Sequence, residues 1–319
     1  MVIFFISFAL CALLTSCKDN GTNSSRSDCA EDAAAKTAFE YFVELSKIPR
    51  CTYNEKEASG YLAAFGKERG FEVFQDTMHN ILIRKRGSKG RENEPYIILQ
   101  AHIDIVCVKD PEAVHDFESD PIIPIVDGDW IKSSKRTTLG ADNGSGVSII
   151  MAILASNCVS HPPIEALFTT QEEAGLKGAL AFDVSQLKGL RLINLDNVTE
   201  EVFFAGSKWD GGDDIIIPML PAALAKIANL PEWPYKENSP LREKMVKVFK
   251  DFYGRAPTIA NINHSRAGVE CMAFAERMPD ACMVSIGPTI ENIHTPDERM
   301  GKLSFERVYE YLVRVLREL

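Results

Sequence analysis

Acidic residues and one histidine follow the predicted strands of this 319-residue chain, or lie in a glycine-rich turn between them. In an open α/β sheet, the carboxyl ends of the strands meet along one crevice, and ligands bind there. So many carboxylates in one place would repel one another unless cations compensated their charge. The pattern therefore predicts a site for two metal ions. The residues concerned are His102, Asp104, Asp142, Glu172, Glu173 and Asp196.

Each of these groups also has a simpler structural interpretation. The pair Glu172-Glu173 could start a helix, where the helix dipole favours acidic residues. Asp142 lies between glycines and could make a turn. These glycines could also suggest phosphate binding, but no Gly-Lys-Ser/Thr follows them and the dinucleotide spacing is not met. Taken together and in this order, the residues favour a metal site.

Strands that alternate with helices position these residues. Runs of apolar residues predict strands, and apolar residues at helical spacing predict amphipathic helices. This alternation is typical of a layered α/β domain. The predicted strands are 71–74, 80–83, 96–100, 164–169 and 191–195, and the predicted helices are 37–48, 55–69, 147–154, 178–182, 241–253 and 305–316.

The composition is that of a folded protein. Hydrophobic residues make up 45% and charged residues 25% of the chain, which excludes a wholly disordered chain. The formal net charge of −10 argues against a nucleic-acid partner, because such proteins usually carry a basic face.

The eight cysteines are widely scattered and include no CxxC pair. We therefore expect no disulfide framework. Cys107, Cys158 and Cys282 have apolar neighbours and are expected to be core residues.

The first residues resemble a bacterial lipoprotein signal. The apolar run is too short to span a bilayer and has the length of a signal-peptide core, and it leads to small residues and then Cys17. We expect residues 1–16 to be a signal peptide, Cys17 to be the lipidation site, and 17–36 to be a flexible tether. The protein is then expected to be exported and anchored to a membrane, on the periplasmic or cell-surface side.

Five motifs occur in a fixed order: H-x-D at 102–104, G-A-D-N-G at 140–144, E-E at 172–173, N-L-D at 194–196 and I-H-T-P-D-E at 293–298. This ordered set resembles the M20 family of di-zinc metallopeptidases, and within it the aminoacyl-histidine dipeptidases. The resemblance extends from residue 42 to the end of the chain. It implies a catalytic domain over 37–319, of α/β class, with a central mixed sheet flanked by helices.

The resemblance also implies a set of metal ligands. His102 and Asp196 would bind one zinc ion, Glu173 and His294 would bind the other, and Asp142 would bridge the two. The implied cofactors are two Zn²⁺ ions, with Co²⁺ or Mn²⁺ as substitutes.

Two further residues have roles implied by the resemblance. Glu172 would be the general base that takes a proton from the metal-bridging water. Asp104 would hold His102 in its metal-binding tautomer. A cis peptide bond between Asp142 and Asn143 is implied as well.

The sequence departs from the family pattern at the lid, in the stretch 207–213 beside it, and near Ala267. Asp196 and His294 are only 98 positions apart, whereas the family has an inserted domain between them that acts as a lid and contributes to dimerisation. We expect the lid to be absent, or reduced to a stub at 207–237, and the protein to be a monomer. His264 is displaced by two residues from the family's substrate-binding histidine, and Arg266 occupies that place, so both are candidate substrate-binding residues.

The resemblance implies zinc-dependent hydrolysis of short peptides, as in a dipeptidase of the Xaa-His type. A lidless hydrolase similar to an aminopeptidase or a deacylase is a second interpretation, because the ligands do not distinguish these reactions. A degenerate lipoprotein that binds metal or peptide without catalysis is a third. The intact Glu172 counts against loss of catalysis, and the missing lid counts for it.

Overall fold

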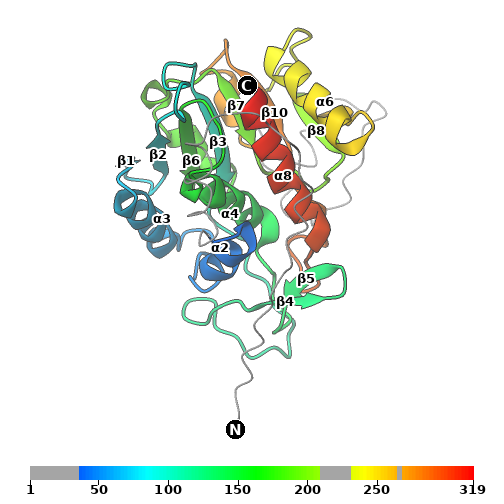
Figure 1. Cartoon of the computed structure of the whole chain (residues 1–319). Coiled ribbons are helices and arrows are strands. Elements are labelled where there is room, and N and C mark those ends of the chain that lie inside the picture. Colours follow the sequence, from blue (N-terminus) through cyan, green and yellow to red (C-terminus); the bar gives the residue numbers. More distant parts are fainter. Residues whose placement is uncertain (1–35, 209–230, 264–267) are drawn as a thin grey trace.

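The computed structural model describes residues 36–208, 231–263 and 268–319 (Figure 1). A mixed sheet of eight strands runs through its centre in the order β1-β2-β6-β3-β7-β10-β8-β9. The fold class predicted from the sequence, α/β with a central mixed sheet flanked by helices, is confirmed. The strands of this sheet are β1 (Glu72–Gln75), β2 (Ile81–Lys85), β3 (Ile97–His102), β6 (Ile164–Thr169), β7 (Arg191–Asn194), β8 (Val202–Lys208), β9 (Thr258–Asn263) and β10 (Cys282–Ser285).

The four central strands, β6, β3, β7 and β10, run parallel to one another. Every residue of β3 and β6 is buried, because helices cover both faces of the sheet. His102 pairs with Thr169, and Gln100 pairs with Asn194, so the carboxyl ends of these strands lie at one edge. This edge is where the strand-end residues of the sequence come together.

Two hydrophobic clusters cover the two faces of the sheet. On β3, Ile97 and Leu99 belong to the first cluster and Ile98 to the second, as expected when alternate side chains point to opposite faces. Figure 1 shows α2, α4 and α8 in front of the strands. The first cluster contains residues of α2 (Ala38–Leu45), α3 (Lys56–Glu68), α4 (Ala141–Ala155), α6 (Pro240–Tyr253) and α8 (Lys302–Glu318), and the second contains residues of α5 (Lys177–Ala181) and α7 (Cys271–Ala275).

A second, antiparallel sheet holds the loop over 292–298. Its order is β11-β12-β5-β4, and β11 and β12 flank this loop on either side. The sequence analysis missed these strands because they are short and three of the four residues of β4 are exposed, which leaves little hydrophobic pattern. The strands are β4 (Pro124–Asp127), β5 (Trp130–Ser133), β11 (Ile290–Glu291) and β12 (Arg299–Gly301).

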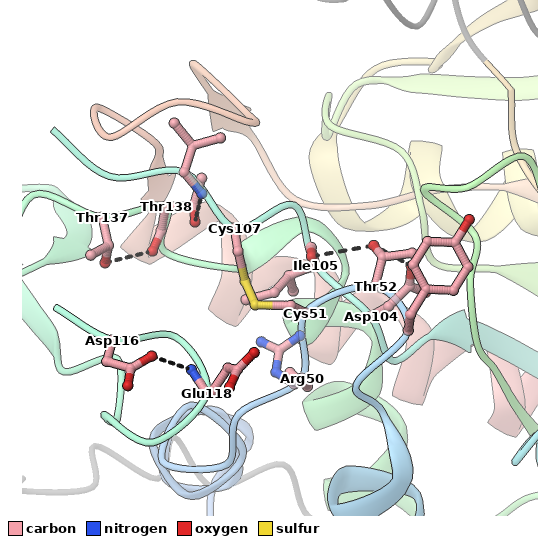
Figure 2. The surroundings of a disulfide bond; sticks show 12 residues. Arg50, Cys51, Thr52, Asp104, Ile105, Cys107, Asp116, Glu118, Thr137 and Thr138 are labelled. Atoms are coloured by element: carbon pink, nitrogen blue, oxygen red, sulfur yellow. Dashed lines mark hydrogen bonds between the residues drawn. A yellow bond between two sulfur atoms is a disulfide. The ribbon is translucent and has the colours of Figure 1, made fainter. Parts of the chain in front are cut away.

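The expectation that the fold contains no disulfides is wrong. Cys51 and Cys107 form a disulfide with their Cα atoms 5.6 Å apart (Figure 2), and Cys158 is disulfide-bonded too. Cys51 and Cys107 are separated by 56 positions, and only the folding of the chain brings them together. The absence of a CxxC spacing therefore gave no information about this pair. Among the described residues, Cys271 and Cys282 are free thiols.

Several sequence predictions lie outside the described residues. They include the signal peptide, the lipidation site Cys17 and most of the proposed lid remnant, as well as His264 and Arg266. Within the described part of the chain, none of the helices combines the length and apolar composition that a membrane crossing needs.

Candidate metal centre

Three neighbouring strands deliver ligand-type side chains to one edge of the sheet. His102 is the last residue of β3. Asp196 comes two positions after the end of β7, and Glu173 comes four positions after the end of β6. These residues are far apart in the sequence, and the parallel pairing of the strands places them together.

Asp142 joins this group from the start of α4. Its backbone has φ −82° and ψ 105°, which is not helical, and the peptide bond to Asn143 is cis. Gly140 precedes it with φ +69°, and a Cβ there would lie 2.8 Å from Nη2 of Arg50. The turn before Asp142 therefore needs a glycine, both for its left-handed backbone and for the room that Arg50 occupies.

The two carboxylate oxygens of Asp142 face different histidines. Its Oδ1 lies 3.1 Å from Nε2 of His102, which is also 3.3 Å from Oδ1 of Asp196. Its Oδ2 lies 3.3 Å from Nε2 of His294, which is also 2.8 Å from Oε1 of Glu173. Asp142 is therefore shared by two adjacent donor groups.

Each of these groups could hold a metal ion. His102, Asp142 and Asp196 offer ligand atoms within 4.8 Å of one another, and so do Asp142, Glu173 and His294. Glu172 forms a third such set with His102 and Glu173. Imidazole nitrogens and carboxylate oxygens are ligands that zinc accepts.

The electrostatics of the centre indicate that positive charge is required there. Burial and the neighbouring carboxylates raise the pKa of Asp196 and of Glu172 well above their usual range. Burial alone would lower the pKa of His294, but Asp142 and Glu173 raise it to about 11. Burial would raise the pKa of Asp142, but His102 and His294 hold it below its usual value. The centre thus buries four carboxyl groups and two imidazoles close together. The charged form of the acids is stable there only when cations lie beside them, and this set of donors fits divalent metal ions.

Asp104 contacts three members of the site. Its backbone carbonyl oxygen lies 2.9 Å from Nδ1 of His102, whereas its carboxylate Oδ1 lies 3.5 Å from that nitrogen. The carboxylate instead accepts hydrogen bonds from the backbone N–H groups of Glu172 (3.0 Å) and Glu173 (3.2 Å). The geometry thus differs from the one expected, because the carbonyl group orients the imidazole while the carboxylate orients the turn after β6.

Glu298 supports the turn that carries Asp142, and the sequence analysis did not single it out. This buried carboxylate accepts hydrogen bonds from four consecutive backbone N–H groups, those of residues 139–142, at 2.8–3.3 Å. The N–H groups at the start of a helix lack partners within the helix, and an acidic residue can satisfy them. The only signal in the sequence was the position of Glu298 four residues after His294, within a motif quoted for the resemblance.

An α/β sheet with histidines and carboxylates gathered at the ends of its parallel strands defines a metallohydrolase-like catalytic domain. The sequence model of peptidase family M20/M25/M40 matches residues 98–318, and the chain belongs to this family. The resemblance inferred from the motifs is thereby confirmed, and the family is one of metal-dependent peptidases.

Two curated relatives match parts of the chain. It is 42% identical over 168 residues to the cytosol non-specific dipeptidase of Escherichia coli K12, an alignment that covers 53% of this chain and 34% of that protein. It is 28% identical over 160 residues to the uncharacterised protein YqjE of Bacillus subtilis 168, an alignment that covers 48% of this chain and 40% of that protein. The chain thus matches well under half the length of these relatives.

Solved structures share the fold. An aminoacylhistidine dipeptidase from Vibrio alginolyticus superposes with a TM-score of 0.78 at 20% identity, over 89% of this chain and 97% of that chain. The aminopeptidase PepT from Bacillus cereus superposes with a TM-score of 0.70 at 17% identity, over 88% of this chain and 97% of that chain. At these identities the similarity establishes the fold alone.

Proposed function

We propose that this chain is a zinc-dependent peptidase that hydrolyses short peptides, with two zinc ions bridged by Asp142. The observation that carries this proposal is that the two carboxylate oxygens of Asp142 face separate groups, one with His102 and Asp196 and the other with Glu173 and His294. A carboxylate whose two oxygens face different donor groups can bind two neighbouring ions at the same time. Membership of a metal-dependent peptidase family supports the same conclusion.

Two zinc ions, when bound, would polarise the scissile carbonyl group and lower the pKa of the attacking water. Glu172 would accept the proton of that water and pass it to the leaving amine. Burial raises the pKa of its carboxyl group, and Asp196 and Glu173 raise it further. A carboxyl group that binds a proton this readily suits a base that must become an acid within one turnover. Asp104 holds the backbone of Glu172 in place.

The substrate class follows from likeness to relatives. The E. coli relative is named as a dipeptidase, and a solved structure with this fold is an aminoacylhistidine dipeptidase. We infer that dipeptides, including those of the Xaa-His type, are the substrates. If the 98 positions between Asp196 and His294 hold no lid domain, selectivity for the free end of a dipeptide should be weak, because a lid supplies end recognition and excludes water.

Hydrolysis assays test this function. The zinc-loaded chain is assayed with Xaa-His dipeptides and with aminoacyl arylamides, and Glu172→Gln is the control because it removes the proton acceptor at nearly constant shape. We expect dipeptide hydrolysis that falls at least 100-fold in the variant. Hydrolysis of arylamides alone would assign an aminopeptidase-like reaction. Bound zinc without any turnover that depends on Glu172 would contradict catalysis.

We also propose that the chain is exported and anchored by a lipid on Cys17. The disulfide between Cys51 and Cys107 supports this location, because disulfides persist in oxidising compartments and are rare in the cytosol. Substitution Cys17→Ser should release the protein from the membrane fraction. A wild-type protein that is already absent from that fraction would contradict the anchor. We further propose a monomer, which light scattering of the purified protein tests.

A further inference from the structure

The Cys51–Cys107 disulfide joins two segments near Asp104 (Figure 2), the residue that orients members of the candidate metal centre. Cys51 lies opposite Ile105 in an isolated parallel bridge. Two backbone hydrogen bonds accompany this bridge, from the N–H of Ile105 to the carbonyl of Arg50 (3.1 Å) and from the N–H of Thr52 to the carbonyl of Ile105 (3.2 Å). A pairing this short is weak by itself, and the disulfide makes it covalent.

The residue after Cys51 contacts the carboxylate that orients the site. Thr52 donates a hydrogen bond from Oγ1 to Oδ2 of Asp104 at 3.0 Å. The same carboxylate accepts the N–H groups of Glu172 and Glu173, and Asp104 is fully buried. A buried carboxylate is costly unless its oxygens are hydrogen-bonded, so loss of the Thr52 hydroxyl would leave Asp104 short of a partner.

The residue before Cys51 contacts the turn that leads to Asp142. The buried guanidinium of Arg50 donates from Nη1 to the carbonyl of Ile103 (2.8 Å) and from Nη2 to the carbonyl of Gly140 (2.9 Å). Gly140 lies two positions before Asp142. The segment 50–52 therefore touches both the strand end that carries His102 and the turn that carries Asp142, and Cys51 is its middle residue.

We propose that the Cys51–Cys107 disulfide is a positioning element of the metal centre, and that its reduction weakens metal binding. This inference rests on the proposed function, because it takes the centre to bind zinc. While the disulfide is intact, Thr52 and Arg50 stay docked on Asp104 and on the turn before Asp142. When it is reduced, only the two backbone hydrogen bonds and the side-chain contacts hold the segment. Residues that orient metal ligands in this way typically contribute 10- to 100-fold to metal affinity or activity.

The reduction is simple chemistry. Cys51 and Cys107 are both half-buried rather than enclosed. A water-soluble phosphine attacks one sulfur and breaks the S–S bond. Water then supplies the oxygen of the resulting phosphine oxide and the two protons of the two thiols, so the phosphine is oxidised by two electrons and the disulfide is reduced by two. A reducing compartment would achieve the same result through thiol–disulfide exchange.

Zinc affinity is the measurement that separates positioning from stability alone. The full-length chain is stripped of metal, and its zinc affinity is measured at 25 °C by competition with a chromophoric chelator. Circular dichroism shows that each sample is folded. The wild type and the double variant Cys51→Ser/Cys107→Ser are each measured before and after phosphine treatment, because phosphine also reduces the disulfide of Cys158 and only the effect absent from the double variant belongs to Cys51–Cys107. Cys282→Ser, which removes a free half-buried thiol, is the matched control.

Two substitutions of Thr52 test the same path with the disulfide left intact. Thr52→Val keeps the shape of the side chain and removes its hydroxyl group, and Thr52→Ser keeps the hydroxyl. We expect zinc affinity to fall 10- to 100-fold in the double variant, in the phosphine-treated wild type and in Thr52→Val, and to stay within twofold in Thr52→Ser and Cys282→Ser. If the double variant does not fold, the comparison of Thr52→Val with Thr52→Ser tests the positioning role by itself.

The outcomes separate the two proposals. A wild type that binds no zinc would refute the proposed function. A wild type that binds zinc, together with a folded double variant or a Thr52→Val variant that binds it equally tightly, would refute the positioning role alone and leave the disulfide with a purely structural one.

Discussion

Substitution of Glu298 by glutamine should destabilise the turn that carries Asp142. The carboxylate of Glu298 accepts four backbone N–H groups, two on each oxygen: those of Leu139 and Gly140 on Oε2, and those of Ala141 and Asp142 on Oε1. In the Glu298→Gln variant one oxygen becomes an amide nitrogen. Two N–H donors then face a donor instead of an acceptor.

The size of the effect follows from two opposing contributions. Hydrogen bonds to a charged group contribute about 1.5–3 kcal/mol each, so losing two costs about 3–6 kcal/mol. Burial raises the pKa of Glu298 to about 7 although the backbone N–H groups lower it, so the neutral amide avoids part of the cost of burying a charge. We therefore expect a net loss of about 2 kcal/mol in the free energy of unfolding.

Urea unfolding of the metal-free protein at pH 8, without reductant, measures this loss. The control is Glu291→Gln, seven positions earlier, which removes a carboxylate from an ion pair with Arg299 in which both side chains are more than 40% exposed. Exposed pairs contribute little, so the control should change the free energy by less than about 0.5 kcal/mol. A Glu298→Gln variant as stable as this control would refute the reasoning.

Two further predictions concern regions away from the ligands. Burial lowers the pKa of His161 to about 4, although its Nδ1 lies 2.7 Å from the carbonyl of Pro162. The unfolded chain takes up this proton near pH 6.5 and the folded chain only near pH 4. Stability should therefore fall by about 3 kcal/mol as the pH drops across this window. Urea unfolding at pH 7 and at pH 4.5 should show that the free energy of unfolding decreases less in His161→Gln than in the wild type. Equal decreases in the two proteins would exclude His161 as the cause. Gly287→Ala would place a Cβ 1.7 Å from the carbonyl oxygen of Asn197, so the urea midpoint should drop by an amount equivalent to about 3 kcal/mol or more. The control is Gly60→Ala in α3, where an added Cβ would have no atom within 4 Å apart from the backbone of its own helix, and this change should be neutral or stabilising. A Gly287→Ala protein as stable as this control would contradict the predicted clash.

The strands β3, β6 and β7 were predicted from the apolar residues that they bury, whereas the fourth central strand, β10, was not predicted. The apolar run at 97–99 and the largely apolar run at 164–168, which contains Glu165, each precede polar residues that lie at the same edge of the sheet. The sequence therefore indicated which side chains converge at this edge. The start of α4 was harder to predict, because residues 141–146 are small or polar and carry no apolar periodicity.

The contacts that support the site were not predictable in the same way. The pairing of Cys51 with Cys107, and the capping of residues 139–142 by Glu298, join positions 56 and more than 150 residues apart. Neither depends on a local pattern of residue types. Each depends on the packing of loops, and short strands such as β4 and β5, which leave little trace in the sequence, form part of that packing.

The number of zinc ions per chain tests the shared ligand most directly. The wild type and the Asp142→Ala variant are saturated with zinc and dialysed to remove excess metal, and bound zinc is measured by inductively coupled plasma mass spectrometry. The control is Asp251→Ala, at an exposed position of α6. We expect two zinc ions in the wild type and in the control, and none in Asp142→Ala, because both sites lose a ligand at once. A wild type that retains fewer than two ions, or an Asp142→Ala variant that still retains two, would contradict a centre bridged by Asp142.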